Sequence, residues 1–404
     1  MITVLLFLIF LAPTIEYRMR VGPVSFSLME PVVLVASIFL FFREYVKKHS
    51  ISWPRHKIFL ILLVLLYWAI FAQVIFSDST QTGLSDIRNW FVPILGFVAL
   101  LSIKRGWEKV IGVYIFTVFL NSLLGIYQYL TNSFRPFQIT FGDSRLGISI
   151  LNGEISLTYN NFALGLFTHP NDYGAYLVGG LMIALGFALT TRKFKDQIII
   201  IPIVAALLFT FSKTSIVISV VLLLGFGVIW LRMRYPVLNW IYLPFVIFLL
   251  IGAIFVVGYL PSAIFATYYW RVGLWEAAYE FFLQNPVFLL IGGGFIEYGK
   301  IAYYIQPHDL YIYMLLQYGL PGLVILLSIL WETIMETVLC FQTNSVNKMM
   351  LAGLFLAVLT TFAIGFTEST LFGIEPRMIF ITWLALCIGF TREKRLEMKH
   401  RKAK

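Results

Sequence analysis

The sequence predicts an all-α, polytopic integral membrane protein. Of its 404 residues, 60% are hydrophobic and 12% are charged, and the mean hydropathy is +0.86. A soluble globular chain has an apolar share of about half, so this composition excludes a soluble fold of that length. Apolar runs long enough, or nearly long enough, to cross a bilayer recur along the whole chain. We therefore expect a single transmembrane domain over residues 1–404.

The apolar runs give about twelve candidate membrane-spanning helices, since a span needs roughly twenty mostly apolar residues. The first, second and seventh runs are shorter than this. The first is interpreted as a retained span, because it lacks a preceding basic segment and a small-residue cleavage site. The predicted spans lie near residues 1–15, 28–42, 57–76, 88–103, 109–130, 171–190, 197–211, 214–231, 238–258, 309–331, 348–367 and 377–391.

The distribution of charge predicts the orientation. Most of the 30 Lys and Arg residues fall in segments that share one side with both termini, such as 43–57, 104–109 and the basic tail 392–404. Cytoplasmic segments of membrane proteins carry this excess. Both termini are therefore expected in the cytoplasm, with segment 259–308 outside it. An anionic inner leaflet explains the net charge of +10, so a nucleic acid partner is not needed.

Segment 259–308 is the longest stretch between apolar runs. A helical pattern begins at Arg271 and stops at Asn285-Pro286. Its members, which lie on one helix face, are Arg271, Trp275, Ala278 and Phe282. This pattern predicts a short amphipathic helix at the outer membrane interface. Arg271 either neutralises lipid phosphate there or binds two oxygens of a phosphorylated substrate through its planar guanidinium. Gly292-Gly293-Gly294 is interpreted as a flexible turn, because no strand precedes it and no Lys-Ser/Thr follows.

Two further outer cations are candidates for phosphate contacts. Lys213 lies in a short polar break between two apolar runs, so it either extends to lipid headgroups or faces a cavity. The neighbouring hydroxyls and the free amides of a helix start favour phosphate binding. Arg88 begins the fourth predicted span and is the third candidate.

His308 immediately precedes the tenth predicted span, and Asp309 occupies the expected N-cap position. A surface histidine beside a helix cap is one interpretation; a general base that works near neutral pH is the other. His169 begins the sixth span beside Pro170 and is interpreted as mainly structural. Asp309 and Glu276 are close enough in sequence to tune His308 or to bind a sugar.

The sequence gives no indication of a metal or a cofactor. The outer segments contain no DxD motif and no cluster of His and Asp. The chain has two cysteines, Cys340 and Cys387, and they form no CxxC pair. We therefore expect chemistry that uses side chains alone.

A series of short motifs between Asn161 and Trp331 resembles the superfamily of O-antigen ligases and Wzy polysaccharide polymerases. The motifs are Phe167-Thr-His-Pro-Asn171-Asp-Tyr-Gly174, Phe211-Ser-Lys213-Thr-Ser215, Arg271-Val-Gly-Leu-Trp275-Glu-Ala-Ala278, Asn285-Pro286 with Gly292-Gly293-Gly294, His308-Asp309-Leu-Tyr-Ile and Gly319-Leu-Pro-Gly322. Each motif alone has low specificity. Their order around one long outer segment is the specific feature.

The resemblance implies a GT-C-like architecture and an inverting, metal-independent glycosyltransferase at the outer face of a bacterial cytoplasmic membrane. The donor would be a glycan on undecaprenyl pyrophosphate, and a hydroxyl of an acceptor glycan would attack it. His308 would activate that hydroxyl, and Arg271 would hold the pyrophosphate. The family usually has Arg at the position of Lys213, which keeps the charge but lacks the planar fork.

The resemblance leaves alternatives open. The Thr-His-Pro-Asn motif and the modest size favour a polymerase, for which a chain-length regulator is a further candidate partner beside membrane lipids. The same residues are expected in an O-antigen ligase that transfers the glycan to lipid A core. A lipid-linked oligosaccharide transporter is the rival from another class. It is disfavoured because the two halves of the chain show no internal repeat.

Overall fold

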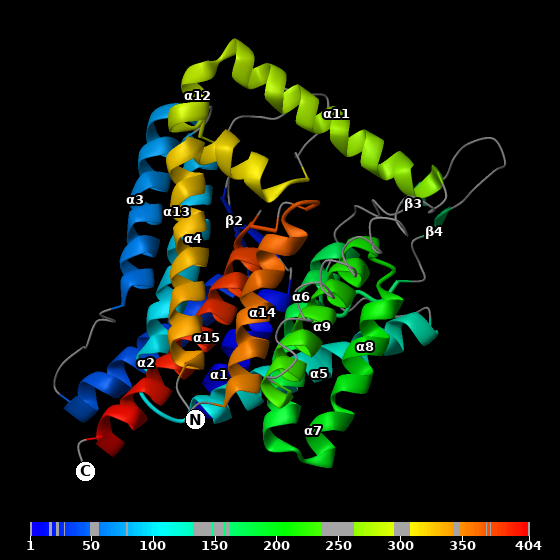
Figure 1. Cartoon of the computed structure of the whole chain (residues 1–404). Helices are drawn as coiled ribbons and strands as arrows, with labels where there is room; N and C mark the ends of the chain where they lie inside the picture. The colour runs from blue at the N-terminus through cyan, green and yellow to red at the C-terminus, as the bar shows by residue number, and fades with distance from the viewer. Residues whose placement is uncertain are drawn as a thin grey trace.

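The computed structural model describes residues 2–15, 18–21, 24–27, 29–48, 56–77, 80–131, 147–148, 157–158, 162–167, 169–235, 262–294, 308–342, 347–368, 370–371 and 373–402. Over these residues the chain is a bundle of helices with two small antiparallel hairpins (Figure 1). The hairpins pair β1 (Arg18–Val21) with β2 (Val24–Ser27) and β3 (Gly147–Ile148) with β4 (Leu157–Thr158).

The helices follow the apolar runs of the sequence. They are α1 (Ile2–Leu11), the 3-10 helix η1 (Ala12–Thr14), α2 (Met29–Lys48), α3 (Lys57–Phe76), α4 (Thr80–Leu101), α5 (Trp107–Thr131), α6 (Pro170–Thr191), α7 (Phe194–Ile198), α8 (Ile200–Phe209), α9 (Lys213–Arg234), α11 (Ser262–Gln284), α12 (Pro286–Ile291), α13 (Leu310–Phe341), α14 (Lys348–Ile364) and α15 (Ile374–Lys402). Every predicted span contains a helix except 238–258, which lies outside the described residues.

Seven of the described helices are long and apolar enough to cross a membrane, namely α3, α4, α5, α6, α9, α13 and α15. The segment Ile2–Thr14 and α14 are apolar but shorter. This confirms a helical, multi-pass membrane protein. The predicted run 197–211 is divided between α7 and α8.

Two predicted helix starts are wrong. Arg88 was expected to begin its span, but α4 begins at Thr80. The polar residues before Arg88 continue the helix, because the Asp86 carboxylate is paired inside the protein. Arg271 was expected to begin a short helix, but α11 begins at Ser262. No glycine or proline lies between these two residues, so nothing in the sequence stops the helix from starting earlier.

Glycines allow α6 and α14 to pack closely. A Cβ atom on Gly186 would lie 2.7 Å from the carbonyl oxygen of Met349, and one on Gly353 would lie 2.4 Å from that of Met182. Small residues at such contacts bring two backbones together, which is a common basis of helix association in membranes. This packing holds the start of α6 beside the loop that follows α14.

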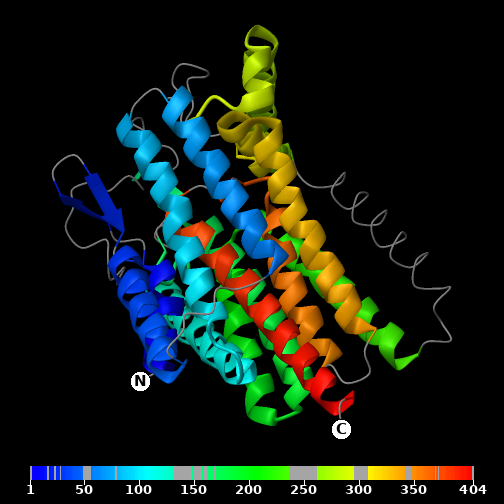
Figure 2. The ribbon, with the colours of Figure 1, turned by 90° about the vertical axis from the view of Figure 1, so that its left-hand side faces the viewer.

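The ends of the bundle differ in character. The start of α1 and the basic end of α15 lie at one end, and α11 lies across the opposite end (Figures 1 and 2). The sequence-based orientation assigns the end with α11 to the outer side. Residues that contact a substrate are therefore expected beneath α11.

α13 bends at Gly319, whose φ is 64° and ψ is −170°, and Pro321 follows. Proline has no N–H, so the carbonyl oxygen of Gln317 loses its usual helical partner. Gly294 N donates to this oxygen at 3.1 Å, and Gly293 N donates to that of Leu316 at 2.8 Å. The glycine segment is thus a turn held against the bend of α13.

Candidate functional site

A cluster of polar side chains surrounds Glu368, in the loop between α14 and α15. Its Oε1 accepts hydrogen bonds from Arg271 Nη2 at 2.5 Å and from Asn171 Nδ2 at 2.8 Å. Its Oε2 lies 3.0 Å from His308 Nδ1. We call Glu368, Arg271, His308 and Asn171 the Glu368 cluster. It joins α11, the start of α13, the start of α6 and the loop after α14.

Backbone hydrogen bonds fix the loop that carries Glu368. Glu368 N donates to the carbonyl oxygen of Ile364 at 3.0 Å, which continues the end of α14. Leu310 N donates to the carbonyl oxygen of Gly365 at 2.7 Å, so the start of α13 is attached to the same loop. Arg377 Nε donates to the carbonyl oxygen of Leu371 at 2.8 Å. His308 and Glu368 are therefore held together by backbone contacts as well as by their side chains.

The conformation of His308 is unusual. Its φ is 44°, in the left-handed region that few residues other than glycine adopt. Such strain persists where the surroundings determine it, often at functional sites. Asp309 follows in an extended conformation and caps α13, accepting hydrogen bonds from Tyr311 N and Ile312 N, both at 2.8 Å. The carboxylate that contacts the imidazole is thus Glu368.

Asp309 is confirmed as the predicted helix cap. Its side chain is buried, and this burial raises the pKa of its carboxyl, although the two backbone N–H donors oppose the rise. Both donors bind Oδ1, which ties the carboxylate to the helix start. Asp309 therefore supports His308 through the backbone.

The Arg271 guanidinium uses only some of its N–H groups in contacts with the described residues. Its side chain is 13% exposed, and Nη2 binds Glu368. Nε is buried and has no hydrogen-bond partner within the described part of the chain. Ala278, seven residues later on the same face of α11, packs with Leu316 of α13. The helix thus holds a guanidinium with a spare N–H at the outer end of the bundle.

The start of α6 contributes Asn171 through a cap. His169 Nδ1 accepts a hydrogen bond from Asn171 N at 3.2 Å, which makes His169 the N-cap of α6. This agrees with the mainly structural role expected for it. The Asn171 amide, which is placed by this cap, reaches Glu368.

Lys213 lies close to the cluster in the fold. It is the first residue of α9, after the N-cap Ser212, and it is exposed. Thr214 Oγ1 accepts a hydrogen bond from Thr367 Oγ1 at 3.3 Å, which places the start of α9 beside the Glu368 loop. The Lys213 ammonium forms no hydrogen bond or ion pair with another described residue. It remains available to an anion at the outer surface.

Two predicted site residues lie apart from the cluster. Arg88 Nε is 3.2 Å from Glu30 Oε2, and Arg88 Nη2 donates to Ser85 Oγ at 3.3 Å. Glu276 is exposed on α11 and contacts no ionic partner among the described residues. The structure therefore unites Arg271 with His308, places Lys213 nearby, and pairs Arg88 with α2.

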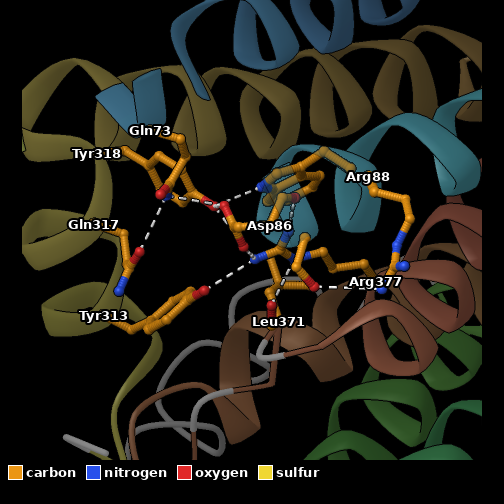
Figure 3. A network of polar contacts seen from close by, with 10 residues as sticks. Gln73, Asp86, Arg88, Tyr313, Gln317, Tyr318, Leu371 and Arg377 are labelled. Carbon is orange, nitrogen blue, oxygen red and sulfur yellow. Dashed lines mark hydrogen bonds and ion pairs between the residues drawn. The ribbon is translucent and has the colours of Figure 1, made fainter. Parts of the chain in front are cut away.

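A buried network lies next to Arg88 (Figure 3). Arg377 is fully buried, and its Nη2 lies 2.6 Å from Asp86 Oδ1 and 2.9 Å from Tyr313 Oη. Tyr318 Oη donates to Asp86 Oδ2, and Gln73 Nε2 donates to the same oxygen at 3.0 Å. Because Arg377 also binds the backbone of Leu371, this network fixes α3, α4, α13 and α15 around the end of the Glu368 loop.

A hollow of about 360 Å³, including its open mouth, lies beside the cluster. Asp172, the residue after Asn171, is on its wall, and three threonine hydroxyl groups share the lining. Tyr176 also lines it, and the Tyr176 Oη is buried without a hydrogen-bond partner among the described residues. The lining residues are Asp172, Ala175, Tyr176, Thr360, Thr361, Thr370, Pro376, Ile379 and Trp383. The accessible lining of the hollow is mostly apolar, with Tyr176 and Trp383 as its aromatic members.

Sequence reasoning missed Glu368 and Asn171. Glu368 is one of two carboxylates between two apolar runs, in Phe366-Thr-Glu368-Ser-Thr370, and Glu375 is the other. A cation at the mouth of a helix bundle needs a negative partner, and this requirement could have pointed to Glu368, which the predicted orientation places on the same side as Arg271. Asn171 lies in the motif Phe167-Thr-His-Pro-Asn171-Asp-Tyr-Gly174, but the sequence does not show that its side chain reaches Glu368.

No protein-family model and no curated protein matches this chain. Its function is therefore inferred from the geometry of the cluster and from the motifs.

Proposed function

We propose that the chain is an inverting, metal-independent glycosyltransferase of the Wzy polysaccharide-polymerase type. Its donor is a glycan repeat unit on undecaprenyl pyrophosphate, and its acceptor is a second lipid-linked repeat unit. The supporting observation is that Arg271 and His308, chosen from the sequence as phosphate ligand and general base, contact the same carboxylate. A base and a leaving-group ligand must lie this close to act on one bond.

The reaction has two electrostatic requirements. The acceptor oxygen attacks the anomeric carbon of the donor, and the bond from that carbon to the pyrophosphate oxygen breaks. The leaving oxygen keeps the electron pair, so negative charge grows on a group that needs no proton. Arg271 supplies a fixed, half-buried positive charge with an unused N–H for this charge. Lys213 adds a second positive charge nearby.

His308 takes the proton of the acceptor hydroxyl. When Nδ1 donates its hydrogen to Glu368, the lone pair of the neutral imidazole is on Nε2. Nε2 then removes the proton as the oxygen attacks the sugar. General base catalysis of this kind contributes about a hundredfold or more. The acceptor sugar would approach beside Asp172, at the mouth of the hollow.

His308→Ala is the first test, with the protein in lipid nanodiscs and lipid-linked repeat units as substrate. We expect elongation to fall by about a hundredfold or more while the lipid still binds, because only the base is lost. His56→Ala is the matched control, since that histidine also caps a helix, α3, and lies beside Glu336 near the far end of α13. Unchanged elongation in His308→Ala would contradict the proposal.

The same assay separates the alternatives. Transfer to lipid A core, without growth of the lipid-linked chain, would indicate an O-antigen ligase. Movement of the lipid-linked glycan across the membrane that is unaffected by His308→Ala would indicate a transporter.

A further inference from the structure

The residue proposed to bind the donor's pyrophosphate is already bound to a carboxylate of the protein. Glu368 Oε1 lies 2.5 Å from Arg271 Nη2, and it is the ionic partner of this guanidinium among the described residues. A carboxylate and a phosphate offer similar oxygens to a guanidinium fork. If the donor binds Arg271, it must compete with Glu368 for the same N–H groups.

We propose that the donor's pyrophosphate displaces Glu368 from the Arg271 guanidinium. The released carboxylate then keeps its hydrogen bond to Asn171, and His308 is its remaining charged partner. This inference depends on the proposed function and adds a role for Glu368, as a positioning residue for the base. Before the donor binds, the charge of Glu368 is shared between Arg271 and His308. After it binds, Asn171 and His308 are the partners that remain.

The charges around His308 favour this exchange. Glu368 faces the imidazole from the loop, Arg271 from α11, and Asp309 from its own helix start, where Asp309 is tied to backbone N–H groups. On α6, Asn171 is neutral, and the Asp172 carboxyl interacts electrostatically with Glu368 and with Glu375 at the start of α15. On α9, Lys213 is exposed and binds none of these carboxylates. Withdrawal of Arg271 therefore leaves the Glu368 carboxylate beside the imidazole without that opposing charge, which favours the contact between Nδ1 and Oε2.

The exchange gives an order to the reaction. With Arg271 on Glu368, the carboxylate would stabilise an imidazolium on His308 only weakly. With pyrophosphate on Arg271, Glu368 accepts a hydrogen bond from His308 Nδ1 and stabilises the imidazolium formed when Nε2 takes the acceptor's proton. The base is thus strengthened only when a donor is present to receive the attack.

A purely structural carboxylate and an exchanging one predict opposite signs for one measurement. If Glu368 only holds Arg271 in place, removing its charge weakens the binding of pyrophosphate. If Glu368 competes for Arg271, removing its charge strengthens that binding. In both cases elongation falls, so the sign of the binding change decides.

The experiment measures binding of inorganic pyrophosphate to the full chain in nanodiscs by titration calorimetry, beside elongation of lipid-linked repeat units. Glu368→Gln keeps the shape of the side chain and removes its charge. We expect pyrophosphate to bind on the order of tenfold more tightly, as is typical of coupled sites. We expect elongation to fall by about a hundredfold or more, because the base is no longer supported.

Controls separate exchange from a general electric-field effect. Glu280→Gln removes an exposed carboxylate from the same helix as Arg271 and should leave both readouts unchanged. In an Arg271→Ala background, Glu368→Gln should give no gain in binding, since there is no guanidinium to release. Should Glu368→Gln fold poorly, Glu368→Asp keeps the charge but shortens its reach, and an intermediate gain in binding is expected.

Equal or weaker pyrophosphate binding by a folded Glu368→Gln, or a gain that persists without Arg271, would overturn the exchange and leave the proposed function standing. The proposed function itself fails if His308→Ala elongates at the wild-type rate. These two failures are recorded in different variants and are therefore distinguishable.

Discussion

Arg271 and Lys213 present different kinds of positive charge to the outer surface. The Arg271 guanidinium is half-buried and held by Glu368, with Nε still without a partner among the described residues. The Lys213 ammonium is exposed at the start of α9. A planar fork binds two phosphate oxygens at once, whereas an ammonium acts as a point charge. Arg271 is therefore expected to determine the position of the pyrophosphate, and Lys213 to add attraction.

Arg271→Lys tests this difference. The charge is kept but the fork is lost, so pyrophosphate binding should weaken by about 1.5–3 kcal/mol, as for a charged hydrogen bond. Lys213→Arg keeps a charge at the neighbouring position and is the matched control, with binding equal to or tighter than wild type. Calorimetry on both variants checks the expectation. Equal binding by Arg271→Lys would show that charge alone suffices.

The loop after α14 shows why the site was only partly predictable from sequence. Arg271 and His308 could be chosen because their residue types and their place in the longest segment between apolar runs are visible in the sequence. Glu368 was not, because its role depends on α11, α6 and α13 meeting at one loop, and local pattern carries no information about such contacts. Asn171 was missed for the same reason.

Among the helices, α4 and α15 are joined by the buried pair of Asp86 and Arg377. The pair explains why an arginine is tolerated in α15, since both Asp86 carboxylate oxygens and all three Arg377 guanidinium nitrogens have hydrogen-bond partners. Removing one member leaves the other charge buried. Because Arg377 also binds Leu371, the loss should loosen the Glu368 loop.

Asp86→Ala should lower the free energy of unfolding by about 3–5 kcal/mol, the usual effect of an uncompensated buried charge. Lys57→Ala is the comparison, because it breaks the exposed pair with Glu332, which is expected to contribute about 1 kcal/mol or less. Thermal unfolding of both variants in the same detergent measures the difference. Equal melting temperatures would mean that the buried pair contributes little.

The helices themselves were largely predictable, because a membrane span is an apolar run and the run is visible in the sequence. Their ends were less so. α4 and α11 begin before the predicted residues, since a polar residue continues a helix when the fold satisfies it, as it does for Asp86. The bend of α13 at Gly319 could be suspected from Pro321, and the glycine turn was predicted, but the contact between the two could not be read from the sequence.

For the whole molecule, the arrangement is a bundle with one long helix, α11, lying across the end opposite the basic end of α15 (Figure 1). α11 places Arg271 above the meeting point of α6, α9, α13 and the Glu368 loop. This meeting point, beside a hollow of about 360 Å³, is where the two substrates would approach each other.

The proposed reaction uses side-chain cations instead of a metal ion, so it should not depend on divalent cations. In the proposed reaction, Arg271 and Lys213 would provide the charge that a divalent cation would otherwise supply to a departing pyrophosphate. Elongation should therefore continue unchanged in excess EDTA. Loss of turnover in EDTA, restored by Mg²⁺, would contradict the mechanism.

The central claim is that Arg271, Lys213 and His308 serve one pyrophosphate-bearing lipid, and the most direct measurement is an electron cryomicroscopy structure with undecaprenyl pyrophosphate bound. The account predicts phosphate oxygens on the Arg271 guanidinium, Lys213 within reach, and Glu368 retained by His308 and Asn171. A headgroup bound elsewhere, with the contact between Arg271 and Glu368 intact, would contradict it.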